Sequence, residues 1–438
     1  MNGKMKYILA DWFERSIPDY IPRKSYTTIF KEDMIFSLVG VRRAGKTFSF
    51  YQNINELQKT IPSKNILYLN FEDDRLYPMQ GNELQILQDT YLQNFNQDSS
   101  FPIYLFLDEI QNIKNWERTV RRIYDTKQNV KIAITGSSSK LLSSEIASSL
   151  RGRTISKIIY PLSFNEFLGF KNFKVKNDEL SNIEYSPQKN KMLKFFNEYM
   201  ENGGFPKVVL AEHKIEILRE YYKAIFFRDI IERNEIRNIK LFENFMKLVT
   251  QSISNRFSYG KAKNTLNSIG FKVSKTTLIE YLTMMESALF IHEVHVFSYT
   301  VKDQLQYPRK IYIIDNGLRN AVCFRFSDDL GLLLENLVFL ALLQKEEEIF
   351  YWQDNNGHEV DFLIRNMNKV VKLIQVCYDV SDSKTRKREE RALYKAMDMF
   401  NLKTGLILTY DYSDKSDKTE CREKQIEYKP VWKWMLEI

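Results

Sequence analysis

Short apolar runs alternate with helical patterns through the first 170 residues of the chain. Four of these runs have the length of buried strands: Met34–Val39, Asn65–Phe71, Ile103–Leu107 and Lys131–Thr135. Strands separated by helix-length segments are typical of a parallel sheet covered by helices. The pattern therefore predicts an α/β domain over residues 1–170.

A helical part and a second α/β part follow. Helical patterns dominate from Met192 to about Ile291, after a polar stretch over Lys171–Lys191 that is typical of a linker or a mobile loop. Near Gly331 the pattern changes again, and it predicts helices over Leu332–Lys345 and Ser383–Phe400 and strands over Ile349–Trp352, Val360–Ile364, Val371–Cys377 and Gly405–Thr409. At roughly 150 residues per domain, 438 residues suggest about three domains. We predict domains over residues 1–170, 192–325 and 331–438.

Composition excludes several classes of protein. With 44% hydrophobic and 27% charged residues, the chain has the profile of a folded protein and not of a disordered one. Its three cysteines form no Cys-x-x-Cys pair and its four histidines have no metal-ligand spacing, so neither a disulfide framework nor a zinc ribbon is indicated. No signal peptide and no membrane-spanning run are evident, which predicts a cytoplasmic protein without a membrane partner. A net charge of +8 is compatible with nucleic acid but does not require it.

The first strand leads into a phosphate-binding loop. The motif G-x-x-x-x-G-K-[ST] is formed by Gly40, Val41, Arg42, Arg43, Ala44, Gly45, Lys46 and Thr47. It lies between a predicted strand and a predicted helix, which is the context that a P-loop requires. Backbone N–H groups of such a loop surround phosphates, the lysine neutralises the β- and γ-phosphates, and the threonine hydroxyl binds Mg²⁺. We predict that these residues bind ATP with Mg²⁺.

Two carboxylates end the third strand. Asp108 and Glu109 follow the apolar run Tyr104–Leu107. Acids at a strand end are common, but together with the P-loop they indicate an ATPase. We predict that Asp108 holds the Mg²⁺ shell and that Glu109 activates the attacking water.

Polar and basic residues farther along are candidates for the γ-phosphate. Thr135 or Ser137, at the tip of the fourth strand, could contact the γ-phosphate or the water, although a simple turn would also explain them. An arginine near the γ-phosphate would neutralise charge that develops during transfer. Arg151 and Arg153 are the candidates, and we favour Arg153 as the catalytic one; the alternative is an arginine at the surface.

These motifs resemble a large prokaryotic family. GVRRAGKT, LFLDEIQNIKNWE, ITGSSSKLL, LRGR and PLSFNEFL occur in the order and at the spacing of that family. Its members carry an N-terminal AAA-type ATPase domain and a C-terminal domain of unknown function. The resemblance runs from about Tyr7 to the end of the chain and is most specific in the first 170 residues. It implies an AAA-type P-loop fold with ATP and Mg²⁺ as ligands, and it says little about the purpose of the ATP.

The middle part has the element order of a winged helix. A short helix over Tyr259–Ile269, a turn capped by Ser274, a helix over Lys275–Leu289 and strands at Phe290–Phe297 and Lys310–Ile314 are predicted. The start of this second helix, the candidate recognition helix for DNA, would carry Lys272, Lys275 and Thr276. Winged helices also bind proteins, so double-stranded DNA and a protein partner both remain open.

The C-terminal part resembles the restriction-endonuclease-like fold. Glu335 on a helix and Asp361 on a strand match the acids of that fold, as in other members of the ATPase family. Gln375 replaces the second acid and Cys377 replaces the lysine, a gap into which Lys387 or Lys372 could move. Metal-dependent cleavage needs carboxylates around a metal, so we predict the fold without nuclease activity.

A basic helix adds a possible contact with DNA. Lys384–Arg391 carries five basic residues against Glu389 and Glu390, a composition that suits either a phosphate backbone or an ordinary solvated helix face. The main hypothesis is an ATPase that acts on DNA or on a DNA-bound partner. The alternative is a nucleotide-gated scaffold with a protein target, and an ATP-dependent nuclease is the least favoured.

Overall fold

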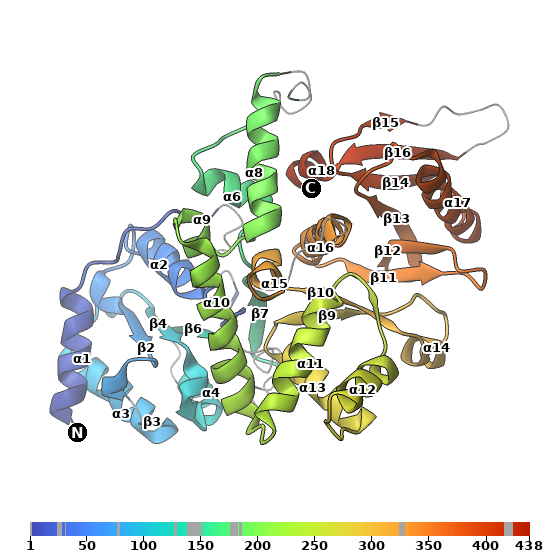
Figure 1. The fold of residues 1–438 in the computed structure, drawn as a ribbon. Coiled ribbons are helices and arrows are strands. Elements are labelled where there is room, and N and C mark those ends of the chain that lie inside the picture. The colour runs from blue at the N-terminus through green and yellow to red at the C-terminus, as the bar shows by residue number, and fades with distance from the viewer. Residues whose placement is uncertain are drawn as a thin grey trace. The chain divides into compact units, whose positions relative to one another are not determined.

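The computed structural model describes residues 2–23, 29–30, 32–76, 79–126, 129–137, 150, 152–175, 183, 186–323, 329–415 and 424–438. They form two compact units (Figure 1). The first comprises Met1–Tyr160 with Ser287–Leu289, and the second comprises Pro161–Glu286 with Phe290–Ile438.

A parallel sheet forms the centre of the first unit. Its strands are β1 (Ile35–Val39), β2 (Ile66–Asn70), β4 (Ile103–Asp108), β6 (Val130–Gly136) and β7 (Thr154–Ile158). They lie in the order β2-β4-β6-β1-β7, and every neighbouring pair is parallel. The four predicted strands and the α/β class are confirmed. The edge strand β7 was not predicted, because its mixed polar sequence TISKI is only half-buried and lacks an apolar run.

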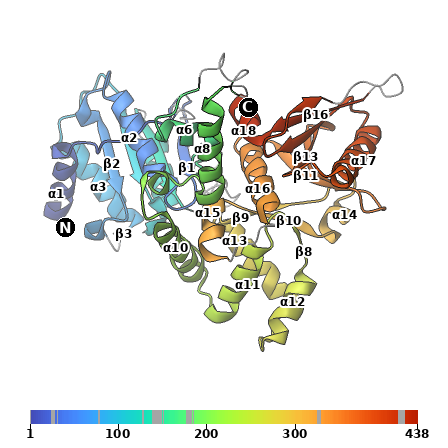
Figure 2. The same ribbon diagram turned by 45° about the horizontal axis from the view of Figure 1, so that its top comes forward.

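Helices and an aromatic cluster complete the first unit. The remaining elements are α1 (Asn2–Glu14), α2 (Lys46–Leu57), α3 (Gly81–Asn94), α4 (Trp116–Thr126), the short strands β3 (Met79–Gln80) and β5 (Ile113–Lys114), and one-turn helices at Ser63–Asn65, Asp74–Leu76 and Ile110–Asn112. Phe50 of α2 packs edge-on against Phe106 of β4, with ring centroids 5.0 Å apart. Trp12 of α1 packs against Tyr68 of β2, so α1 lies beside that strand (Figure 2).

The helical part of the second unit contains the predicted helix–turn–helix and hairpin. Its helices are α6 (Phe164–Phe170), α8 (Gln188–Asn202), α9 (Pro206–Leu210), α10 (Lys214–Ala224), a π-helical segment (Ile225–Glu232), α11 (Ile239–Gln251), α12 (Tyr259–Ser268), α13 (Lys275–Ser287), α14 (Val301–Gln306) and α15 (Asn316–Val322). Its strands β8 (Arg256–Phe257), β9 (Ile291–Val294) and β10 (Arg309–Ile313) form an antiparallel sheet in the order β8-β10-β9.

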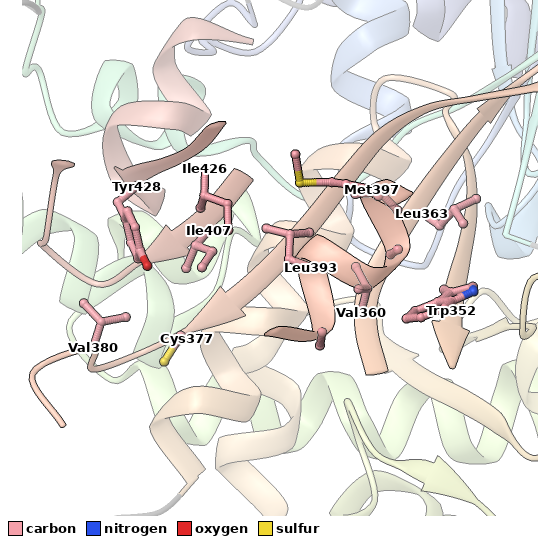
Figure 3. Close-up of a cluster of buried hydrophobic side chains, with 13 residues drawn as sticks. Trp352, Val360, Leu363, Cys377, Val380, Leu393, Met397, Ile407, Ile426 and Tyr428 are labelled. Atoms are coloured by element: carbon pink, nitrogen blue, oxygen red, sulfur yellow. The ribbon is translucent and has the colours of Figure 1, made fainter. Parts of the chain in front are cut away.

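A six-stranded mixed sheet follows. It consists of β11 (Glu348–Gln353), β12 (Glu359–Asn366), β13 (Lys369–Cys377), β14 (Thr404–Thr409), β15 (Asp414–Lys415) and β16 (Gln425–Pro430), with the helices α16 (Asp329–Leu343), α17 (Ser383–Phe400) and α18 (Val431–Glu437). The order is β11-β12-β13-β14-β16-β15, with parallel pairing only from β13 through β14 to β16. Leu393 and Met397 of α17 pack on Ile407 and Tyr428 of the sheet (Figure 3).

The middle and C-terminal parts therefore belong to one compact unit, whereas the sequence suggested a domain for each. The predicted boundaries themselves stay a prediction. Among the residues that the structure describes, none of the helices is both long enough and apolar enough to cross a membrane.

Candidate nucleotide-binding site

The P-loop connects β1 to α2 and is held in a narrow space. Gly45 has φ 106°, a left-handed conformation that glycine adopts without strain, and α2 begins at the next residue, Lys46. At Gly40 a Cβ atom would lie 2.3 Å from the carbonyl oxygen of Ile159. The glycine at position 40 is thus required by the close approach of the chain that leaves β7.

Lys46 is buried and already faces a carboxylate. Its Nζ lies 3.2 Å from Oε1 of Glu109 and donates a hydrogen bond to the carbonyl oxygen of Gly40 at 3.1 Å. Only 4% of the residue is exposed. The ammonium group therefore lies inside the curve of the loop, where a phosphate would have to displace one of these partners.

Asp108 ends β4 and is completely buried. Its carboxylate accepts hydrogen bonds from the hydroxyls of Thr47 (2.7 Å), Tyr68 (2.8 Å) and Thr135. Burial and the charge of Glu109 raise the pKa of Asp108, and the three hydroxyl donors oppose that rise because they stabilise the ionised form. Two strands, β2 and β6, and the P-loop helix α2 thus place hydroxyl donors around the carboxylate at the end of β4.

Glu109 follows in a left-handed conformation, with φ 54°. Its backbone N–H donates to Oγ1 of Thr135 at 2.9 Å, and Nε2 of Gln111 donates to its carboxylate at 2.6 Å. Burial raises the pKa of Glu109, but Lys46, Gln111 and Arg42 together outweigh burial and lower it overall. The group is therefore ionised at neutral pH and is held by the same lysine that the P-loop motif supplies.

The oxygen atoms of this group are suitable ligands for a magnesium ion that is bound together with a phosphate. Mg²⁺ prefers oxygen ligands such as carboxylate, hydroxyl and water, and it often binds through one or two carboxylates together with substrate phosphates. The Thr47 hydroxyl and the Asp108 carboxylate provide such oxygens side by side, at the start of a helix that favours anions.

The structure brings most of the predicted residues together. Lys46, Thr47, Asp108 and Glu109 form one hydrogen-bonded group, and Ser137 is buried immediately after β6. Arg42 points its guanidinium group at Glu72, 2.6 Å away. The contribution of each of these residues to ATP binding or hydrolysis stays a prediction.

Arg153 is not part of this group, contrary to the prediction. It precedes β7, and its carbonyl oxygen accepts the N–H of Ile35 at the beginning of β1, whereas the P-loop follows the end of that strand. At 3.2–3.4 Å per residue, the first and last residues of β1 are separated by about 13 Å along the sheet. Arg153 lies at the first of these ends and the P-loop at the other. The Arg153 side chain instead pairs with Asp125 at 2.8 Å. Arg151, the other candidate, lies outside the described residues.

Two residues at the site were missed by the sequence analysis. Tyr68 donates to Asp108 from the neighbouring strand β2, and Arg23 donates from Nη1 to the carbonyl oxygens of Ala44 and Tyr160. Tyr68 lies in a predicted strand, where a tyrosine is usually part of the core. Arg23 lies in a segment without periodicity, so no sequence signal distinguished either residue.

Comparisons with known proteins decide the family. A model of an AAA domain matches residues 32–168, and models of two domains of unknown function, DUF8612 and DUF4143, match residues 193–330 and 330–426. The uncharacterized protein MJ1544 of Methanocaldococcus jannaschii is 40% identical over 97% of this chain and 95% of its own length. The chain belongs to this family of AAA-type P-loop ATPases. An uncharacterized protein of Haemophilus influenzae is 31% identical to this chain, and the alignment covers 81% of this chain and 85% of that protein.

A solved structure is also similar to this ATPase-family chain. The Walker-type ATPase PABY2304 of Pyrococcus abyssi aligns with a TM-score of 0.42 at 14% identity. The alignment covers 73% of this chain and 93% of that protein.

Tyr68→Phe is expected to move the acidic limb of the pH profile of ATPase kcat/KM to higher pH. The hydroxyl of Tyr68 stabilises ionised Asp108 and so lowers its pKa; without it that pKa rises, and the ionised form is lost at a higher pH. A net hydrogen bond of about 0.5–1.5 kcal/mol corresponds to a shift of up to about one pH unit. Tyr104→Phe, on β4 and away from the carboxylate, is the control, and identical profiles for parent and Tyr68→Phe would contradict the expectation.

Proposed function

We propose that this chain binds ATP with Mg²⁺ and hydrolyses it. The observation that supports this proposal is the convergence of Lys46, Thr47, Asp108 and Glu109 in one buried group at the carboxyl ends of β1 and β4. Family membership supports the same conclusion, because the AAA domain model covers this entire group.

Each of these residues has a separate role in the proposed reaction. Lys46 would leave Glu109 to neutralise phosphate, and the freed carboxylate would accept a proton from the attacking water. Thr47 and Asp108 would hold Mg²⁺, which supplies charge neutralisation at the phosphate oxygens. Thr135 fixes both acids at once, since its hydroxyl donates to the Asp108 carboxylate and accepts the Glu109 N–H. The test is phosphate release from ATP by the purified protein, which we expect to require Mg²⁺. Release at the same rate in the presence of EDTA would contradict the proposal.

We further propose that ATP turnover acts on double-stranded DNA or on a DNA-bound partner, with α12, α13 and the β9–β10 hairpin as a winged helix. Ser274 caps α13 by accepting the N–H of Thr277 at 3.0 Å. Lys272, Lys275 and Thr276 are exposed at that helix start. Exposed lysines at the beginning of such a helix are placed to contact phosphates.

The double variant Lys272→Glu, Lys275→Glu is expected to weaken DNA binding at least about tenfold at 100 mM salt. Two phosphate contacts would become repulsive, and the dependence of log K on log salt should lose a slope of about 2. Lys240→Glu with Lys247→Glu is the matched control, because it makes the same charge change on exposed positions of α11. Fluorescence anisotropy with a duplex measures both. Equal affinity for the double variant and the parent would exclude this surface.

A protein target remains the second candidate, and one surface favours it. Beside Lys275, a hollow of about 180 Å³ is lined by Ile279, Tyr307 and Arg309 among others. Ile279 and Tyr307 are 39% and 47% exposed, and a protein partner that entered the hollow would cover both side chains.

The basic helix α17 offers less to DNA than its sequence suggested. Arg386 bonds Glu390 and packs on Tyr428, and Arg388 bonds Glu389. The exposed part of the predicted basic face consists of Lys384, Lys387, Arg388 and Arg391, of which Arg388 is also paired with Glu389.

A further inference from the structure

The acids of the nuclease-like sheet surround a lysine. Nζ of Lys310 lies 2.7 Å from Oδ1 of Asp361, 3.0 Å from Oε1 of Glu335 and 2.8 Å from Oε1 of Glu359. Lys310 is on β10 of the middle part, and β10 lies beside α16, which carries Glu335 (Figure 1). Lys310 is 2% exposed, so its ammonium group is shielded from solvent and contacts these three carboxylates instead.

The backbone opens at this point to make room for the acids. The ladder between β12 and β13 ends at the pair Phe362–Ile374. Beyond it, side chains replace main-chain bonds: Gln375 Oε1 accepts the N–H of Asp361 at 3.1 Å, and Asp361 Oδ2 accepts the N–H of Val376 at 2.9 Å. Gln375 therefore has a structural role in place of a second metal-binding acid.

A further acid and two arginines complete the charge balance. Nε2 of Gln375 donates to Glu389 of α17 at 2.7 Å, and Glu389 is also paired with Arg388. Glu359 is paired with Arg256 at 3.2 Å as well as with Lys310. The four carboxylates thus face three cations, and Tyr312 donates its hydroxyl to Glu335 at 2.7 Å.

The pKa values of Glu335 and Lys310 also reduce the net charge of this cluster. Burial raises the pKa of Glu335 to about 8, with Asp361 adding to the rise. Burial alone would lower the pKa of Lys310, but the surrounding carboxylates raise it well above the usual value. The lysine is therefore charged at neutral pH, and the raised pKa of Glu335 reduces the excess of negative charge in the cluster.

A divalent metal does not fit this arrangement. Metal-dependent cleavage in such a fold requires a cation between Glu335 and Asp361, with oxygens about 2.0–2.6 Å away. The ammonium group of Lys310 already holds both oxygens, and its positive charge would repel a metal ion. In the described part of the chain, no group of three or more acidic, histidine or cysteine side chains is arranged to hold a metal.

We propose that Lys310 takes the place of a divalent cation among Glu335, Glu359 and Asp361, and so closes this cluster to metal. The proposal is independent of the ATPase function. It also changes the reason for the predicted lack of nuclease activity. From the sequence alone no cation was expected in the cluster, and Lys372 and Lys387 were the candidates to supply one. Lys372 pairs with Glu347 and Lys387 is exposed, whereas the cation comes from Lys310, on a distant segment.

The test is Mn²⁺ binding by the full chain without nucleotide, followed by electron paramagnetic resonance. We expect that Lys310→Met gains one Mn²⁺ site, at least about tenfold tighter than any site of the parent, and that Lys310→Met with Asp361→Asn loses it again. Lys372→Met, an exposed lysine on β13, should behave as the parent. A folded Lys310→Met variant without a new site overturns the proposal.

Lys310→Met leaves buried carboxylates without their cation, which can prevent folding. Lys310→Met with Glu359→Gln removes one positive and one negative charge together and keeps Glu335 and Asp361 for the metal, so the same gain of a site is expected there. The parent protein provides a measurement that needs no variant at position 310. If the parent binds Mn²⁺ and loses it on Asp361→Asn, or cleaves supercoiled DNA with Mn²⁺ in a manner that Asp361→Ala abolishes, the cluster is open to metal and the proposal is wrong.

Discussion

Glu109→Gln is expected to retain ATP affinity and to lower kcat for ATP hydrolysis by roughly 10²- to 10⁴-fold, the usual contribution of a general base. Glutamine has the same shape but accepts no proton from water. The N–H that binds Thr135 belongs to the backbone and is unaffected. Lys46 would lose its paired carboxylate and remain available to phosphate. Binding should therefore persist while the chemical step is lost.

Calorimetric titration with ATP and a phosphate-release assay on the same preparation separate these two effects. Glu56→Gln is a suitable control, because it makes the same change at an exposed residue near the far end of α2, where the carboxylate pairs with Lys59. Hydrolysis by Glu109→Gln at the parental rate would place the base elsewhere. Loss of ATP binding would instead show that Glu109 positions the loop.

Lys46→Ala is expected to weaken ATP binding by roughly 10- to 150-fold, which corresponds to the loss of about 1.5–3 kcal/mol for a hydrogen bond to a charged group. The phosphates would lose their fixed cation. Glu109 would in addition remain as an uncompensated negative charge next to the phosphate site, because Lys46 is its nearest partner of opposite charge.

Isothermal titration with ATP and Mg²⁺ measures this loss. Lys59→Ala, at an exposed lysine just beyond α2, is the control. A thermal unfolding curve of each variant shows whether the fold is intact. Unchanged affinity in folded Lys46→Ala would remove the basis of the nucleotide site.

Local sequence patterns were sufficient to predict the strands at the centre of the first unit. The four apolar runs became β1, β2, β4 and β6, each within one residue of its predicted limits. The P-loop and the acids after β4 came together because parallel strands place their carboxyl ends at one edge of a sheet. Spacing along the chain is enough for this inference, since topology and strand direction follow from the alternation of strands and helices.

The position of Arg153 could not be derived while the strand that it precedes was unknown. Arg153 was a candidate because an arginine near the γ-phosphate would neutralise charge that develops during transfer. The edge strand β7 has no apolar run to reveal it, and it starts at the opposite end of β1. Without knowledge of β7, the end of the sheet at which Arg153 lies could not be predicted.

The sequence by itself determined the α/β fold, the P-loop, and the acids Asp108 and Glu109, because each depends on a contiguous motif and the regular geometry of strands, and the resemblance to a known family implied the AAA type. Only the tertiary structure decided the surroundings of those acids and the state of the C-terminal cluster. Tyr68 reaches Asp108 from a neighbouring strand, and Lys310 is 51 residues from Asp361 in sequence but 2.7 Å from its carboxylate. A buried charge needs a partner in space and not in sequence, since the free energy of its burial depends on what surrounds it.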